Sequence, residues 1–271
     1  MGCRPRGHRY AILKMRFLPL ILAAITLPAF AAEEVQTIRT EKPGRRTELV
    51  TTGGRAHSTF LFSPENNDPG WVFGVGMRMT IIPKRIAESE TRFFPLLEAH
   101  LNKNFLKYLQ WRNSLGVLYL QNFLSTGIYG VVHGRWLSVS LGNSAAVWGG
   151  VFNSSGFDAL TATFVTHPTV SVGFNHLSHY YYWLPDSLSL TYRLNILHNR
   201  YTRLGNSVFQ ERSFSFEGFS VLLMAEYYTG KGGIYLGLQV NHARPGYEFW
   251  LAFSDYDRFF QYTTMFAGYR F

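Results

Sequence analysis

Large apolar residues alternate with small or polar ones along much of the chain after residue 70. In the clearest segment, the odd-numbered positions from Trp71 to Ile81 are all apolar, whereas the even-numbered ones are mostly small or polar. A period of two predicts a β-strand with one apolar face. The same alternation returns in 97–102, 188–196, 234–241 and 247–254. The chain is therefore predicted to be all-β from residue 71 onward.

Marking every alternating stretch gives about twelve strands as the best count, with eight or ten as the alternatives. A tight turn at His167-Pro168 is expected to separate two of them, and 199–212 is longer than a short periplasmic turn. The predicted strands are 71–83, 92–105, 111–121, 127–134, 136–150, 158–166, 168–178, 187–197, 214–228, 234–242, 247–254 and 259–271.

A soluble β-sandwich alternates in the same way, so the period alone leaves the fold class open. Three further features favour a closed antiparallel transmembrane β-barrel over 71–271. The N-terminus has the features of a secretory signal, aromatic residues gather at the ends of the segments, and the last segment ends on Tyr269-Arg270-Phe271. This ending resembles the C-terminal strand of bacterial outer-membrane barrels, and the resemblance implies that the barrel assembly machinery recognises the terminal aromatic residue.

Residues 1–31 have the order of a signal peptide. Five basic residues precede an apolar stretch at 17–27, and Ala29-Phe30-Ala31 follows as a small-residue cleavage site. The apolar stretch is too short to span a bilayer, which argues against the alternative of an uncleaved anchor. We therefore expect cleavage after residue 31 and a mature protein in the outer membrane.

Composition changes the picture once this segment is set aside. The chain of 271 residues is 46% hydrophobic and only 16% charged, which excludes a disordered chain. Five of its 26 basic residues leave with the signal peptide, so 21 remain against 17 acidic ones and the net charge falls to about +4. Nucleic-acid binding then loses its main support. The single cysteine, Cys3, leaves as well, so neither a disulfide nor a thiolate site is expected.

The stretch 32–70 is polar and rich in turn residues, and only 59–62 resembles a short strand. We interpret it as a periplasmic tail or a segment that folds into the lumen. A small independent domain is the weaker alternative, because one short apolar run cannot form a core.

The alternation also predicts what faces the lumen. Arg78, Arg193 and Arg270 share the polar face with Glu98 and Glu248. Buried charges persist when they are paired, so a hydrogen-bonded plug is favoured over a selective channel.

Standard catalytic motifs are lacking, and one polar constellation remains at 175–179. The parity that directs Phe174 toward lipid continues to His176 and Ser178, and lipid-facing positions resist unpaired polar groups. A turn at His167-Pro168 would pair 164 with 170 and so bring Asp158 beside His176. Ser178, His176 and Asp158 would then be a nucleophile, a base and an orienting acid. If Phe271 lies on the periplasmic side, orienting the predicted strands backwards from 259–271 to 168–178 places the adjoining loop, 179–186, outside the cell.

The His176-x-Ser178 pair resembles that of outer-membrane phospholipase A and, less closely, of the lipid A deacylase barrels. The segment 229–238 is also similar to a late hairpin of the phospholipase. The resemblance implies a lipid acyl-ester hydrolase on the outer barrel wall, with calcium as a cofactor known only through this likeness. The chain departs from these families because His179 follows Ser178 where they have Ser-Asn. Asp158 comes from the pairing above and has no counterpart in the resemblance.

The competing interpretation is that His176 and Ser178 are ordinary interfacial residues beside the aromatic run 180–183. We favour a non-enzymatic envelope barrel, structural or with a narrow pore, and keep the hydrolase as the alternative. The expected partners are outer-membrane lipids and the assembly machinery, with no nucleic acid. The sequence does not specify the oligomeric state.

Overall fold

The structure is a computed structural model of the chain, and it describes residues 60–64, 70–83, 93–106, 108–117, 121–134, 136–154, 157–181, 183–204, 207–228, 232–244 and 259–271. All of them belong to one unit, Thr47–Phe271. The predicted signal peptide and the tail up to residue 59 lie outside the described residues, so both stay predictions.

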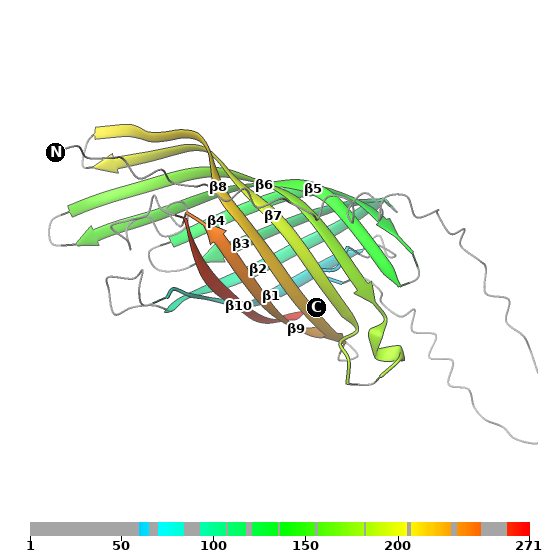
Figure 1. Cartoon of the computed structure of the whole chain (residues 1–271). Helices are drawn as coiled ribbons and strands as arrows, with labels where there is room; N and C mark the ends of the chain where they lie inside the picture. Colours follow the sequence, from blue (N-terminus) through cyan, green and yellow to red (C-terminus); the bar gives the residue numbers. More distant parts are fainter. Residues whose placement is uncertain are drawn as a thin grey trace, which may run out of the picture. The chain divides into compact units, whose positions relative to one another are not determined.

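Ten strands of the described chain form a closed antiparallel barrel (Figure 1). Each strand pairs with its neighbours in sequence, and β1 pairs with β10 to close the ring. The strands are β1 (Trp71–Ile81), β2 (Phe93–Leu106), β3 (Leu109–Val117), β4 (Gln121–His133), β5 (Leu137–Ser154), β6 (Phe157–Asn175), β7 (Ser187–Leu204), β8 (Ser207–Tyr228), β9 (Gly233–Ala243) and β10 (Phe260–Arg270).

The predicted closed antiparallel barrel is confirmed, and its strand number is ten, one of the two alternatives to twelve. The expected turn at His167-Pro168 is wrong, because β6 runs through both residues and Pro168 pairs with Asn143 of β5. The ladder to β7 lacks pairs at 167 and 168, where proline has no N–H to donate. The predicted strand 247–254 lies outside the described residues, and β9 pairs directly with β10.

The wall is apolar outside and polar inside. On β1 the exposed side chains are Trp71, Phe73, Val75 and Met77, whereas Arg78 is buried. The other strands repeat this division as the alternation predicts. Buried polar residues on them include Glu98, Asn102, Ser138, Ser171, Asn175, Ser187, Glu226, Gln239, Asn241 and Thr264. No helix in the described part of the chain is both long and apolar enough to cross a membrane.

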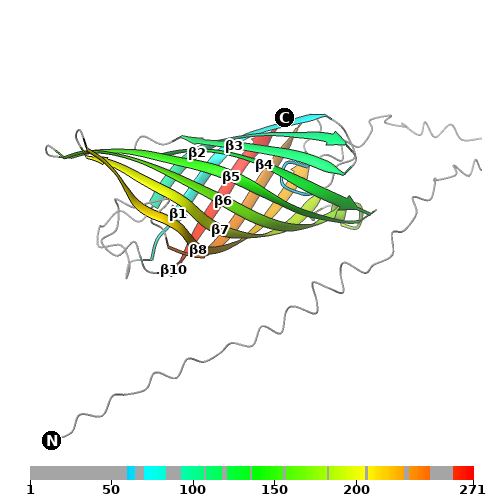
Figure 2. The same ribbon diagram turned by 90° about the horizontal axis from the view of Figure 1, so that it is seen from above.

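Two neighbouring hairpins are much longer than the rest. Strands β5 to β8 have 18, 19, 18 and 22 residues, whereas β1, β9 and β10 have 11 each. The hairpins extend at the end of the barrel opposite the C-terminus (Figures 1 and 2). We call this the distal end, and the end that carries Trp71 and Phe271 the terminal end. The stretch 199–212, which was too long for the short periplasmic turn expected there, lies largely in the extended tips of β7 and β8.

An apolar cluster fills part of the lumen between β2 and β7. It consists of Leu96, Phe123, Ala146, Trp148, Val165 and Leu197. Gly116 on β3 makes room for it, because a Cβ at this position would overlap the Phe123 ring and lie 2.7 Å from Leu96 Cδ2. Gly130 on β4 differs, since a Cβ there would meet only Leu141 O at 3.7 Å.

These two glycines give a matched test of the lumenal packing. Gly116→Ala should lower the free energy of unfolding by about 1–3 kcal/mol because it overpacks the cluster. Gly130→Ala should change it by less than about 0.5 kcal/mol. Denaturant titration of the refolded protein measures both, and Phe123→Leu should partly rescue Gly116→Ala. Equal stability of the two alanine variants would contradict this packing.

Candidate functional site

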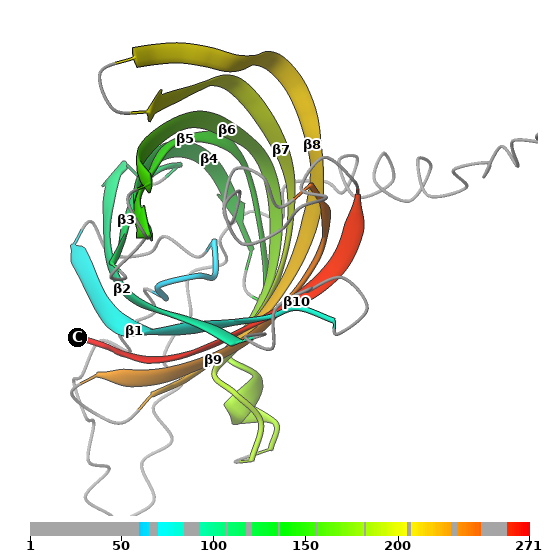
Figure 3. The same ribbon diagram turned by 90° about the vertical axis from the view of Figure 1, so that its left-hand side faces the viewer.

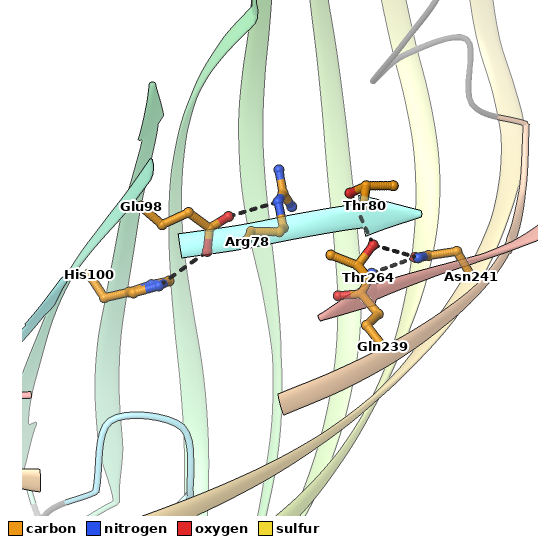
Figure 4. Close-up of polar contacts among 7 residues, drawn as sticks. All are labelled: Arg78, Thr80, Glu98, His100, Gln239, Asn241 and Thr264. Atoms are coloured by element: carbon orange, nitrogen blue, oxygen red, sulfur yellow. Dashed lines mark hydrogen bonds and ion pairs between the residues drawn. The ribbon is translucent and has the colours of Figure 1, made fainter. Parts of the chain in front are cut away.

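A salt bridge occupies the middle of the lumen. Arg78 Nε lies 3.0 Å from Glu98 Oε1, and His100 Nε2 lies 3.4 Å from Glu98 Oε2 (Figure 4). The Arg78 guanidinium carbon also lies 5.0 Å from the ring centre of Phe123 and 5.3 Å from that of Trp148. The predicted pairing of lumenal charges therefore holds for Arg78 and Glu98, whereas Glu248 lies outside the described residues.

These contacts cross the lumen. Arg78 belongs to β1 and Trp148 to β5, which stand four positions apart in a ring where five positions is diametrically opposite. Side chains from nearly opposite walls therefore meet at this level. We call Arg78, Glu98, His100, Phe123 and Trp148 the arginine layer. A second group of hydrogen bonds continues it along β1, β10 and β9, where Thr264 contacts Thr80 at 3.2 Å and accepts from Asn241 Nδ2 at 3.3 Å (Figure 4).

A piece of chain that is not part of the wall lies inside the lumen. Residues 60–64, which we call the lumenal segment, lie within the ring of strands (Figure 3, in blue). Their main chain bends at 61–63 and directs three successive N–H groups at one carboxylate of β8. Leu61 N donates to Glu226 Oε2 at 2.8 Å, and Phe62 N and Ser63 N donate to Oε1 at 2.8 and 3.1 Å.

Two asparagines complete the polar contacts of the lumenal segment. Asn102 Nδ2 on β2 donates to Leu61 O at 2.7 Å, and Ser63 Oγ donates to Asn175 Oδ1 on β6 at 2.7 Å. Asn175 is itself held by the wall, since its Nδ2 donates to Ser138 Oγ at 2.9 Å and its Oδ1 also accepts from Ser187 Oγ at 3.0 Å. The wall thus orients this amide through contacts that do not involve the segment.

Aromatic rings hold the two phenylalanines of the lumenal segment. Phe62 packs between His100 and Tyr235, with ring centres 5.1 and 4.9 Å away. Phe60 packs against Tyr228 at 5.2 Å and His176 at 6.4 Å. Together with Glu226, Asn102 and Asn175, these rings form a site on four strands that we call the lumenal cup.

Sequence reasoning missed Glu226. It is the single charged residue in the stretch 221–228, at a position whose parity directs it inward with Met224 and Ser220. The available signal was a carboxylate with inward parity in a stretch, 221–228, that has no basic residue. Its hydrogen-bond donors from the lumenal segment are main-chain N–H groups, which no pattern of residue types reveals.

The loop between β6 and β7 forms one rim of the barrel mouth. His176 has φ 60° and ψ 30°, so it leaves the strand geometry just before the short 3₁₀ turn Leu177–His179. Ser178 Oγ donates to Asp186 Oδ1, and Tyr228 N donates to Asp186 Oδ2 at 2.5 Å. A hydroxyl has one proton, so Ser178 donates its hydrogen bond to Asp186 and not to His176.

The structure separates the predicted catalytic residues. Asp158 lies near the start of β6, where it pairs with Asn153 at the distal tip, whereas His176 follows Asn175, the last residue of the same strand. At about 3.3 Å per residue, about 60 Å of chain along the strand separates them. The predicted proximity of Asp158 to His176 is wrong because the turn that would create it does not exist. The catalytic roles of Ser178 and His176 stay predictions.

The same strand count moves the loop to the other end of the barrel. The loop connects Asn175, the last residue of β6, to Ser187, the first residue of β7. At the same end of the barrel, Ser187 pairs with Glu226 near the end of β8, Tyr228 pairs with Gly233 at the start of β9, and Gly233 pairs with Arg270 at the end of β10. The loop therefore lies at the terminal end, on the same side as Phe271. The sequence placed it opposite the C-terminus because a further strand, 247–254, was expected between the strands that are β9 and β10, which pair directly. No group of three His, Cys, Asp or Glu side chains among the described residues could hold a metal ion.

Comparisons with known proteins give distant likenesses, all of them to solved structures. No protein-family model and no curated protein matches the sequence. Among solved structures, the translocator domain of the autotransporter NalP from Neisseria meningitidis is similar, with a TM-score of 0.39 and 8% sequence identity. The match covers 76% of this chain and 90% of that chain. The likeness is too distant to assign a family or an activity.

The contacts of Glu226 predict a graded response to its replacement. Glu226→Ala leaves three N–H groups of the lumenal segment without their acceptor and should lower the free energy of unfolding by about 2–4 kcal/mol. Glu226→Gln retains a carbonyl oxygen and should cost less. Denaturant titration measures the stability, and amide hydrogen exchange at 61–63 should accelerate most in the alanine variant. Wild-type exchange at 61–63 in the alanine variant would contradict the observed contacts.

Proposed function

We propose that the protein is an integral β-barrel of the bacterial outer membrane whose role is structural, with a lumen closed by its own side chains and by the lumenal segment. The observation that carries this proposal is the reversed polarity of the wall, which places Leu, Phe and Val outside and Arg, Glu and Asn inside. A soluble barrel would have the opposite arrangement, since water would face the exterior.

The dimensions of the wall support a membrane location. A tilted transmembrane strand needs about 9–11 residues, and β1, β9 and β10 have 11 each. Aromatic residues border this band at the terminal end, where Trp71 contacts Trp111 and Phe73 stacks on Phe271. Phe216 and Phe259 form a similar contact toward the distal end. Two aromatic borders around an apolar band are typical of outer-membrane barrels.

The orientation follows from the C-terminal strand. If the assembly machinery recognises Phe271 from the periplasm, the terminal end faces the periplasm and the long hairpins of β5 to β8 face outward. The rim loop, the lumenal cup and the tail that precedes residue 60 would then share the periplasmic side. Calcium and an outer-leaflet substrate have no role in this proposal.

The closed lumen argues against an open diffusion pore. The lumenal segment contacts β8, β6 and β2, and β2 stands four positions from each of the other two in the ring of ten. The arginine layer lies next to it on the distal side. The lumenal segment and the arginine layer thus obstruct the lumen at two successive levels, which in a ten-strand barrel favours a structural role over a channel.

The location can be tested directly. The mature chain should fractionate with the outer membrane and migrate differently on gels before and after heating, because a closed barrel resists detergent until it is heated. Removal of Phe271 should reduce assembly, whereas Met265→Leu, an outward substitution of similar size, should not. Recovery of the wild type as a soluble periplasmic protein would refute the proposal.

The alternative function, a lipid acyl hydrolase that uses Ser178 and His176, requires a separate test. Purified protein in mixed micelles with phospholipid or lipopolysaccharide, with and without calcium, should release no fatty acid above a boiled control. Ser178→Ala, His176→Ala and Asp158→Ala would show the same background. Release by the wild type that Ser178→Ala abolishes would support the hydrolase instead, and a further loss in Asp186→Ala would identify the acid.

A further inference from the structure

The lumenal cup binds its occupant through the main chain. Four of the five hydrogen bonds to the lumenal segment involve backbone atoms, namely the N–H groups of residues 61–63 and the carbonyl of Leu61. The fifth uses the hydroxyl of Ser63. A site that contacts mainly backbone atoms accepts a bent peptide of more than one sequence.

The wall side of the cup is organised independently of the segment. Ser138 and Ser187 fix the Asn175 amide. Tyr235 is held flat against the inner wall, because Gly76 and Gly268 leave room for its hydroxyl end where any Cβ would collide with it. Preorganised partners lower the cost of binding a peptide.

Glu226 makes an empty cup unfavourable. Its side chain is buried, and the lumenal segment supplies donors to both of its oxygens. A buried carboxylate deprived of its donors pays a desolvation cost that water or another donor must offset. A vacated cup is therefore expected to attract a new set of convergent N–H groups.

The arginine layer borders the cup on its distal side. Phe62 packs on His100, and Glu98 and Arg78 of the arginine layer follow on the distal side of that histidine. The opposite side leads to the mouth, where Phe60 meets His176 of the rim loop. We therefore expect a replacing peptide to enter from the terminal end.

We propose that the lumenal cup is a peptide-binding site, and that residues 60–64 are a tethered occupant which a peptide segment of another polypeptide can replace. The replacing segment has a bent main chain with aromatic side chains flanking an aliphatic one, as in Phe60-Leu61-Phe62. Residues 65–69 tether the occupant to β1, so it competes at high effective concentration. The source of the peptide rests on the proposed function, because only a periplasmic terminal end exposes the cup to periplasmic proteins.

Deletion of residues 60–64 exposes the cup to a free peptide. A fluorescent peptide with the sequence of residues 58–66 should bind the deletion variant saturably, and at least about tenfold more tightly than it binds the wild type. Adding Glu226→Ala to the deletion should weaken binding about a hundredfold, since three hydrogen bonds to a charged group are lost. Glu217→Gln, which changes a buried carboxylate at the distal part of β8, is the matched control and should leave binding unchanged.

The probe itself provides a second control. N-methylation of its residues corresponding to Leu61 and Phe62 removes two donors and should weaken binding by about tenfold or more. A deletion variant that is heat-modifiable but binds the peptide no better than its Glu226→Ala version would overturn the peptide site while leaving the outer-membrane barrel intact.

The wild type provides a measurement that needs no deletion. Millimolar free peptide should displace the tethered occupant and accelerate amide hydrogen exchange at 61–63, but not in the paired β9 residues. The N-methylated peptide should have no such effect. Unchanged exchange at 61–63 with both peptides would overturn the proposal even if the deletion variant fails to fold.

Discussion

The whole structure depends on the pairing of β1 with β10. These strands stand at opposite ends of the barrel sequence, yet they pair from Gly74 with Arg270 to Ile81 with Thr263. An open sheet would leave two rows of unpaired N–H and C=O groups, which a hydrocarbon environment does not tolerate. Closure removes both edges and fixes one face of every strand inside. The period of two in the sequence then becomes an apolar wall around a polar lumen.

A polar lumen in a ten-strand ring creates a second constraint, because its charges are buried and must find partners across a narrow space. Glu98 finds Arg78 and His100, which belong to the wall itself. Glu226 finds main-chain N–H groups of a segment that comes from outside the wall. The first solution is permanent once the barrel closes. The hydrogen bonds of the second exist only while that segment stays in place, although Arg270 of β10 also stabilises the charge of Glu226, so Glu226 is the point where the filling of the lumen can change.

The sequence predicts the wall well because alternation is a local property. The apolar outer face of β1 and the inward positions of Arg78 and Glu98 follow from parity within single strands. Closure does not, and its prediction came from the N-terminus, the aromatic segment ends and the last strand. Strand number and ends are harder to predict, since they depend on breaks. Pro168 suggested a turn, but a strand tolerates proline where its ladder to one neighbour is already interrupted. The position of Asp158 depended on that turn. Glu226 was invisible for a different reason, because its partners are backbone atoms of a distant segment.

The residues that the sequence singled out still belong to a connected part of the molecule. Ser178 and the Tyr228 amide both donate to Asp186, and the Asp186 N–H donates to the Glu226 carbonyl at 2.8 Å. The carbonyl of Glu226 thus holds the rim loop, and its carboxylate holds the lumenal segment. Phe60 and His176 contact each other across the same mouth. The geometry therefore links Ser178 and His176 to the entrance of the lumenal cup. A change in the rim loop and a change in the lumenal segment would both act on Glu226, the first through its carbonyl and the second through its carboxylate.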